Sequence, residues 1–294
     1  MKYIGVIVCI FTIILATHGA YEGRTLVQKW KKADFWLMKA NTEETFNILV
    51  LGDSRIFFGV NPDILRENKN QKALNFAFPT ISFTKHYLDQ AGKLLAPNAH
   101  VYIGLTAQAF TNFNTDSGLT SFEKRGPLYM NRLMGWLRIY WPTINLELLI
   151  QRGQIPLFTN QRQSDLDIYH SNGWIESPQL PTSDGQEMAM SYRELFKKHT
   201  IKKEIVKNLN AEIMNWHKRG MKVTVFWTCF NKKVCEEEAI VLSEGVKESI
   251  DKSLVESGAE IIQTSPEKFS TFDGDHLIGS EAIRFSSQIR KISL

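Results

Sequence analysis

The chain has 294 residues, of which 43% are hydrophobic and 22% are charged, a composition that is ordinary for a globular protein with a large core. Its formal net charge is only +4, and no dense run of Lys and Arg alternates with aromatic residues. We therefore expect a globular protein without a nucleic-acid partner. One domain with an insertion and two separate domains both fit this length.

The N-terminus predicts export. Met1 and Lys2 precede an almost wholly apolar run from Tyr3 to Ala16, so residues 1–20 are expected to be a signal peptide or a signal anchor. The run is shorter than the roughly 20 apolar residues that span a bilayer comfortably, which favours cleavage. The poor cleavage site Thr17-His18-Gly19 favours an anchor. Both readings predict a periplasmic or cell-surface protein that is secreted or membrane-anchored; a core helix of an intracellular domain is the third alternative.

Residues 21–45 form an amphipathic connecting segment, and Gln28 to Met38 predict a helix within it. Trp and Lys side chains suit a membrane surface, whereas tryptophans at helical spacing suit packing on a protein core. Both interpretations stay open.

From Phe46 onward, strands and helices alternate, which predicts a parallel sheet with helices on both faces. The expected strands are Ile48–Leu51, Ala73–Phe76, Val101–Gly104, Lys222–Trp227 and Glu260–Gln263. The expected helices are Pro62–Glu67, Phe83–Leu95, Tyr192–Lys218, Ala239–Ser257 and one that starts at Ser280. We expect the domain that these elements build to span 46–294.

The alternation breaks at about 105–191, a stretch that is too long for an ordinary connection. It contains Gly126-Pro127, the aromatic-rich segment Trp136–Pro142 and a polar tract from Asn160 to Gln186. We expect an inserted cap over the edge of the sheet. Its aromatic residues suit either contact with a sugar or acyl chain or packing of the cap on the sheet.

Cys229 and Cys235 follow a predicted strand and are the only cysteines beyond Cys9 of the apolar run. A disulfide between them fits an oxidising compartment, and two unrelated thiols are the alternative. The histidines show no metal-ligand spacing, and no glycine-rich phosphate loop occurs, so neither a metal nor another cofactor is expected.

Two short segments at opposite ends carry the predicted chemistry. Asn47–Ser54 is a buried strand followed by a turn that presents a serine, and Asp273-Gly274-Asp275-His276 supplies a histidine three residues after an acid. A serine is a good nucleophile only when an imidazole takes its proton, and a carboxylate orients that imidazole. We therefore expect Ser54 as nucleophile, His276 as base and Asp273 as the orienting acid.

These two blocks resemble the SGNH/GDSL-type hydrolases, whose pattern opens with Gly-Asp-Ser after the first strand and closes with Asp-x-x-His. The resemblance implies a three-layer α/β/α sandwich with a parallel sheet in flavodoxin-like order. Its oxyanion hole would use the N–H groups of Ser54 and Ala77. The asparagine that usually follows the third strand is missing, and Thr106 stands near its place. Such departures resemble a divergent, membrane-associated branch that includes the teichoic acid D-alanylation protein and polysaccharide O-acetylation factors.

The expected function is that of a serine esterase or O-acyltransferase acting on a small acyl ester or an acylated polysaccharide of the cell envelope. The missing asparagine favours the alternative, a catalytically weak SGNH-like module that binds a polysaccharide or a membrane partner during envelope assembly. Asp275 lies beside His276 in the chain, so its side chain is expected to point elsewhere, solvated or capping a turn.

Overall fold

The computed structural model describes residues 32, 34–113, 117–123, 167–181, 183–265 and 269–293. The apolar segment 1–20, residues 21–31 and 33 of the connecting segment, Gly126-Pro127 and Trp136–Pro142 lie outside the described residues. Within the described ranges, no helix is both long enough and apolar enough to cross a membrane.

Five parallel strands form the central sheet in the order β2-β1-β3-β6-β7. Their bounds are β1 Phe46–Leu51, β2 Ala73–Asn75, β3 Leu95–Leu105, β6 Lys222–Trp227 and β7 Glu260–Ile261. This confirms the predicted α/β class and parallel sheet, and the order corresponds to that of flavodoxin-like sheets. The strand order reverses beside β1, the point where open α/β sheets bind ligands beyond the carboxyl ends of their strands.

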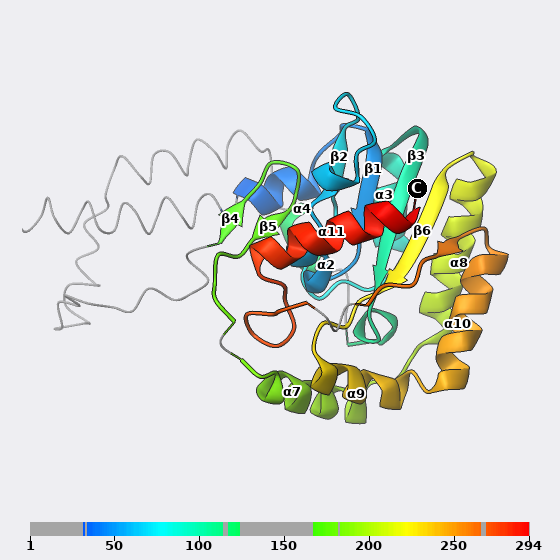
Figure 1. Ribbon diagram of the computed structural model, residues 1–294. Coiled ribbons are helices and arrows are strands. Elements are labelled where there is room, and N and C mark those ends of the chain that lie inside the picture. Colours follow the sequence, from blue (N-terminus) through cyan, green and yellow to red (C-terminus); the bar gives the residue numbers. More distant parts are fainter. Residues whose placement is uncertain are drawn as a thin grey trace, which may run out of the picture.

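Helices cover both faces of the sheet. The helical segments are α2 Ser54–Gly59, η1 Pro62–Leu65, α3 Lys85–Lys93, η2 Gln108–Phe110, α4 Ser117–Glu123, α7 Gln186–Lys198, α8 Lys203–Lys218, α9 Lys232–Val241, α10 Glu244–Glu256 and α11 Gly279–Ser293. Figure 1 shows α11 crossing one face, where it packs against α2 and η1, and α3 on the opposite face, where it packs against α8. The sheet therefore lies between two helical layers, in agreement with the predicted α/β/α arrangement.

The sequence pattern explains this burial. Ile48 to Leu51 of β1 are each at most 2% exposed, because an apolar strand without alternation suits a sheet covered on both faces. In α11, Ala282, Phe285 and Ile289 are fully buried at helical spacing, and the Phe285 ring contacts the Phe226 ring of β6.

Two of the predicted helices are each divided into two. The prediction of one helix over Tyr192–Lys218 is wrong between Lys198 and Lys203, because Ile201 bridges Thr111 and the Lys202 N–H donates to the Phe110 carbonyl. These contacts replace the hydrogen bonds that a continuous helix would make.

The helix predicted over Ala239–Ser257 is likewise divided, because α9 ends at Val241 and α10 begins at Glu244. The Ser243 carbonyl accepts hydrogen bonds from the N–H groups of Val246 and Lys247, so it starts the second helix.

A hairpin in the described part of the insertion packs against α2 and the carboxyl end of β2. Strands β4 Ile168–Tyr169 and β5 Ile175–Glu176 form an antiparallel hairpin. The Trp174 Nε1–H donates to the Phe58 carbonyl of α2 over 3.0 Å, and the Asn75 N–H of β2 donates to the Asn172 carbonyl over 2.8 Å. The hairpin therefore braces α2 and the adjacent end of β2.

Residues 34–40 are helical and pack on the domain. Trp36 is 5% exposed, and its ring contacts the rings of Phe57, Phe78 and Phe122. The buried Lys39 Nζ donates to the Gly173 carbonyl over 2.9 Å, which ties this helix to the hairpin. The described part of the connecting segment thus follows the core-packing interpretation.

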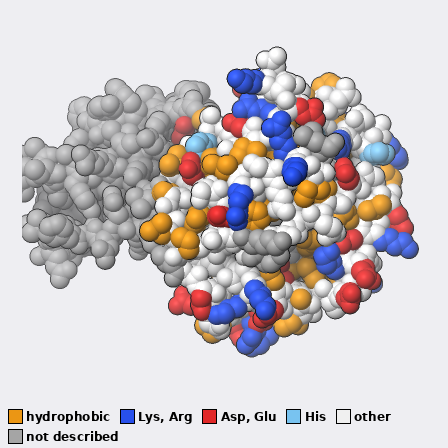
Figure 2. Space-filling view, viewed as in Figure 1, with side chains coloured by type: hydrophobic (Ala, Val, Ile, Leu, Met, Phe, Trp, Pro, Cys, Tyr) orange, Lys and Arg blue, Asp and Glu red, His pale blue; other side chains and the backbone are white. Residues whose placement is uncertain are grey.

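Positive and negative side chains are interspersed over the described face in Figure 2, with hydrophobic side chains between them. Some charges are paired, such as Lys72 with Glu44 at 2.8 Å. Exposed pairs of this kind contribute little to stability, so the core around the sheet holds the fold together.

Candidate active site

A tight turn at the end of β1 presents Ser54. β1 ends at Leu51, and α2 begins at Ser54 with Asp53 as its N-cap, whose Oδ1 accepts from the Arg55 N–H over 3.1 Å. Gly52 has φ +148°, and a Cβ there would lie 2.3 Å from Ile56 Cγ1. Glycine is required because α2 lies so close to the strand end. Asp53 thus orders the turn.

The loop from Thr271 to Leu277 holds the histidine in a fixed conformation. Asp273 Oδ1 accepts from the N–H groups of Asp275 and His276, over 2.9 and 2.8 Å, and the Phe272 N–H donates to the His276 carbonyl. Gly274 supplies the left-handed residue of this turn with φ +93°. The acid three residues before the histidine therefore shapes the backbone and also faces the imidazole.

The three predicted catalytic side chains lie together at the carboxyl edge of the sheet. His276 Nε2 lies 2.8 Å from Ser54 Oγ, although 222 residues separate the two in the chain, and His276 Nδ1 lies 2.6 Å from Asp273 Oδ2. When Nδ1–H donates to Asp273, Nε2 can accept the proton of the Ser54 hydroxyl. The His276 side chain is 15% exposed, so solvent reaches the site.

Opposing effects set the pKa values of His276 and Asp273. Burial lowers the pKa of His276, but the hydrogen bond that its Nδ1–H donates to Asp273 and the negative charges of Asp275 and Asp273 outweigh it, so the pKa is raised overall. Burial raises the pKa of Asp273, but its bonds to His276 and to the loop N–H groups outweigh it, so this pKa is lowered. Asp273 is therefore an ionised partner for an imidazole that becomes positive.

Two aromatic rings flank the imidazole. The ring centroids of Phe58 and Phe272 lie 5.1 and 5.7 Å from that of His276, and the two phenyl rings contact each other. Phe58 lies on α2 beside the nucleophile, whereas Phe272 belongs to the histidine loop. These rings restrict the imidazole to the plane in which it faces Ser54.

Two of the three expected oxyanion donors have other partners, which corrects the sequence-based assignment. The Ala77 N–H donates to Asn75 Oδ1 over 3.1 Å, and the Thr106 hydroxyl donates to Asp53 Oδ2 over 2.6 Å. Both residues are fully buried. The Ser54 N–H lies in the first turn of α2, where N–H groups have no acceptor within the helix.

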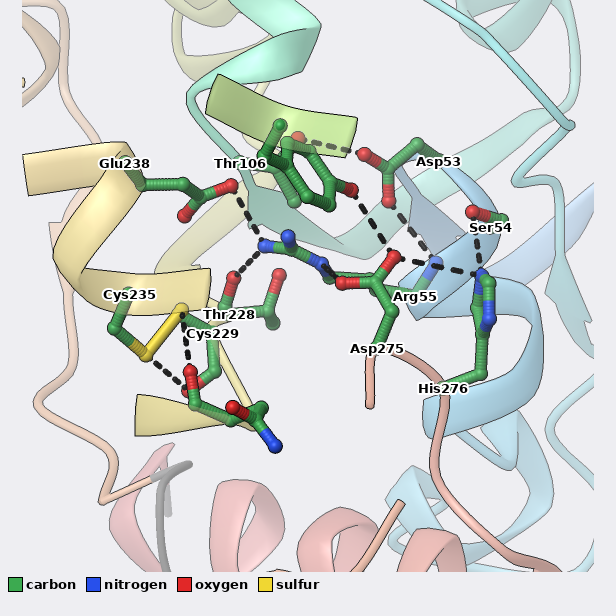
Figure 3. A network of polar contacts seen from close by, with 12 residues as sticks. Asp53, Ser54, Arg55, Thr106, Thr228, Cys229, Cys235, Glu238, Asp275 and His276 are labelled. Atoms are coloured by element: carbon green, nitrogen blue, oxygen red, sulfur yellow. Dashed lines mark hydrogen bonds and ion pairs between the residues drawn. A yellow bond between two sulfur atoms is a disulfide. The ribbon is translucent and has the colours of Figure 1, made fainter. Parts of the chain in front are cut away.

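The expectations that the Asp275 side chain points away from His276 and that it is solvated are both wrong, because its Oδ2 lies 3.7 Å from His276 Nε2. Asp275 is 3% exposed, and its Oδ1 accepts from Arg55 Nε over 2.6 Å, while its Oδ2 accepts from the Tyr192 hydroxyl over 3.0 Å (Figure 3). Arg55 also reaches Glu238 with Nη1 over 2.9 Å. A charged residue inside the otherwise apolar α2 sequence was the signal that could have indicated a buried ion pair.

Cys229 and Cys235 form a disulfide with a Cα–Cα distance of 5.5 Å. It closes the loop that connects β6 to α9, directly beside the residues that contact Arg55 (Figure 3). The structure therefore confirms the predicted disulfide, and the alternative of two unrelated thiols is wrong.

In the portion of the chain that the structure describes, no group of three or more His, Cys, Asp or Glu side chains could hold a metal ion. Comparisons of the chain with protein-family models, with curated proteins and with solved structures find no match. The geometry of the site is therefore the basis for a functional proposal.

Proposed function

We propose that the protein is a serine esterase or O-acyltransferase in which Ser54, His276 and Asp273 form the catalytic triad. The observation that carries the proposal is the continuous line of contacts from Ser54 Oγ to His276, at 2.8 Å, and from His276 to Asp273, at 2.6 Å. A nucleophile, a base and an acid that orients the base are the requirements of covalent acyl transfer.

In the proposed reaction, Ser54 Oγ attacks the acyl carbonyl carbon while its proton passes to His276 Nε2. Asp273 stabilises the imidazolium, which then protonates the leaving alcohol and leaves an acyl group on Ser54. Water or a sugar hydroxyl next attacks this ester and gives its proton to His276. Ser54 leaves with that proton, so the enzyme returns to its starting state.

The Ser54 N–H is the proposed donor to the oxyanion, since the expected donors of Ala77 and Thr106 bond to Asn75 and Asp53. Loss of one oxyanion donor costs roughly a hundredfold to a thousandfold in a well-studied serine protease. We therefore expect slow turnover of simple esters.

An ester or acylated carbohydrate of the cell envelope is the proposed substrate class. The apolar N-terminal run supports an extracytoplasmic location, periplasmic or at the cell surface. The Cys229–Cys235 disulfide supports the same location, because disulfides persist in oxidising compartments. The acceptor, water or a sugar, decides between hydrolysis and transfer.

Kinship with the SGNH/GDSL-type hydrolases is part of this proposal. Three features support it: the nucleophile follows the first strand, the Asp-x-x-His block precedes the last helix, and the parallel sheet has flavodoxin-like order.

The test is labelling of the full chain with a fluorophosphonate probe, which reacts with activated serines. The wild type is expected to be labelled, and Ser54→Ala and His276→Ala are expected to lose the label. Ser82→Ala is a matched control, because the buried Ser82 hydroxyl only donates to the Ala109 carbonyl. Equal labelling of wild type and Ser54→Ala would contradict the proposal.

The second candidate is a catalytically weak module that binds a polysaccharide or a membrane partner during envelope assembly. The observation that favours it is the engagement of the Ala77 and Thr106 donors, which leaves the oxyanion poorly supported. Absence of labelling in the wild type, together with no turnover of p-nitrophenyl acetate, would select this candidate.

A further inference from the structure

The residue that follows the nucleophile is a fully buried cation. Arg55 is 0% exposed, and its Nε lies 2.6 Å from Asp275 Oδ1. Its Nη1 donates to the Thr228 carbonyl over 2.7 Å and to Glu238 Oε1 over 2.9 Å (Figure 3). A buried charge is costly unless it is paired, so these contacts hold the guanidinium in one place.

The Arg55–Asp275 ion pair joins the two residues that adjoin Ser54 and His276 in the chain. Arg55 directly follows Ser54, and Asp275 directly precedes His276. The Arg55–Asp275 contact therefore joins the same two segments as the Ser54–His276 contact, which are 220 residues apart in the chain. The Tyr192 hydroxyl holds the second oxygen of Asp275 over 3.0 Å, so this carboxylate is fixed from two sides.

The other two acceptors of Arg55 flank a loop that a disulfide closes. The Thr228 carbonyl lies just before Cys229, and Glu238 lies on α9 after Cys235. Figure 3 places the disulfide beside these two acceptors. One side of the guanidinium is thus bound to residues that flank the disulfide loop and the other side to the histidine loop.

We propose that Arg55 is a positioning residue that sets the distance between Ser54 and His276 by fixing the histidine loop through Asp275. This inference rests on the proposed function for its kinetic consequence. The planar guanidinium offers Nε and Nη1 in a fixed geometry to partners on two sides, which the single ammonium group of lysine cannot reproduce. Arg55→Lys therefore keeps the positive charge but loses the alignment of the contacts on the two sides.

Reactivity is sensitive to such alignment, because a misplacement of about 1 Å can lower a rate by about a hundredfold. If Arg55 served stability alone, a folded variant would keep the rate of wild type. The labelling rate of Ser54 and the state of the His276 imidazole therefore separate positioning from stability.

The experiment compares the full chain of the wild type with Arg55→Lys and Asp275→Asn. Two readouts are taken on protein that circular dichroism shows to be folded: the rate of fluorophosphonate labelling and the low-field NMR signal of the His276 Nδ1 proton. The labelling rate is expected to fall about a hundredfold in both variants. The NMR signal is expected to shift or broaden, because the imidazole loses its fixed position.

Arg193→Lys is the matched control. Arg193 on α7 pairs with Glu237, the neighbour of Glu238 on α9, and its side chain is 58% exposed. It does not contact the triad, and wild-type labelling and NMR signals are expected in this variant.

A folded Arg55→Lys protein with the labelling rate and the His276 signal of wild type overturns the inference. If Arg55→Lys fails to fold, Asp275→Asn decides by its labelling rate on the high-pH plateau, where loss of the charge that lies 3.7 Å from His276 Nε2 no longer changes the fraction of neutral imidazole. If the wild type is not labelled, the proposed function fails, and the NMR comparison alone decides whether Arg55 positions His276.

Discussion

His276 accepts a proton only in its neutral form, so the pH dependence of the reaction reports its pKa. The charged groups that act on it are Asp273, Asp275, Arg55 and, from the inserted hairpin, Asp167. Burial lowers the pKa of His276, but the two loop carboxylates raise it above its ordinary value of 6.5. In the proposed mechanism, the active form should therefore predominate only above that pH.

We predict that kcat/KM for p-nitrophenyl acetate rises with pH and reaches half of its plateau above pH 6.5. Asp275→Asn removes a charge that raises the pKa, so its midpoint should lie at lower pH than that of wild type. A pH–rate profile of both proteins is the measurement. A midpoint that is unchanged in Asp275→Asn would show that this carboxylate does not act on the catalytic imidazole.

The residues of the proposed triad were selected from the sequence because each belongs to a short local pattern. A serine after an apolar strand and an acid three residues before a histidine are both visible in short segments of sequence. The Arg55–Asp275 pair could not be predicted in this way, because no local pattern pairs these two residues and their burial depends on the folded loop. The partners of Ala77 and Thr106 depend on the fold in the same manner.

Contacts link the loop between β6 and α9, which carries the disulfide, to residues next to the proposed triad. Thr228 and Glu238, which bind Arg55, lie on either side of the Cys229–Cys235 bond. Asn231 of the same loop lies against Gly185, and Gly185 lies against Gly274 of the histidine loop. Movement of this loop should therefore reach the catalytic groups by two routes.

We predict that a reductant slows fluorophosphonate labelling of wild-type Ser54. The double variant Cys229→Ser/Cys235→Ser should be slow without reductant and should not respond to it, and Cys9 remains in both proteins as a control. The free energy of unfolding of the double variant should be about 2 kcal/mol lower than that of wild type, which is the chain-entropy value for so short a loop. Equal labelling rates with and without reductant would argue against this connection.

The elements differ in how well the sequence predicted them. β6 was predicted at its observed bounds, Lys222–Trp227, because its apolar run is bounded by clear turn residues. The breaks before Lys203 and before Glu244 were missed, since helical periodicity continues through both. A tertiary hydrogen bond from the Lys202 N–H to the Phe110 carbonyl marks the first break, and the local bonds that the Ser243 carbonyl accepts mark the second.

The buried carboxylates also affect the stability of the entire fold. Burial raises the pKa of Glu238 to about 7 from its ordinary value of 4.5, although Arg55 opposes the shift. The folded protein therefore binds a proton more tightly at this site than the unfolded chain does. Stability that depends on this proton is fully present below pH 4.5 and is lost as pH rises through about 7.

We predict that the free energy of unfolding decreases between about pH 5 and pH 8, and that Glu238→Gln decreases less over that interval. Urea denaturation at several pH values measures both. Glu237→Gln is the control, because Arg193 keeps the pKa of Glu237 below its ordinary value and its effect lies at lower pH. If the free energy of unfolding decreased equally with pH in Glu238→Gln and in wild type, the raised pKa of Glu238 would be contradicted.

The architecture was predictable because alternating strands and helices permit few arrangements. The parallel sheet and its two helical layers follow from that alternation. The packing of the inserted hairpin against α2 and β2 could not be predicted, because it depends on single contacts such as Trp174 with the Phe58 carbonyl.

The most direct measurement is mass spectrometry of the protein, quenched in acid at short times after mixing with p-nitrophenyl acetate, followed by peptide mapping. We predict one acetyl group on Ser54 in wild type and none at this position in His276→Ala. Consumption of the substrate without any acetyl group on Ser54 at any quench time would contradict the covalent mechanism.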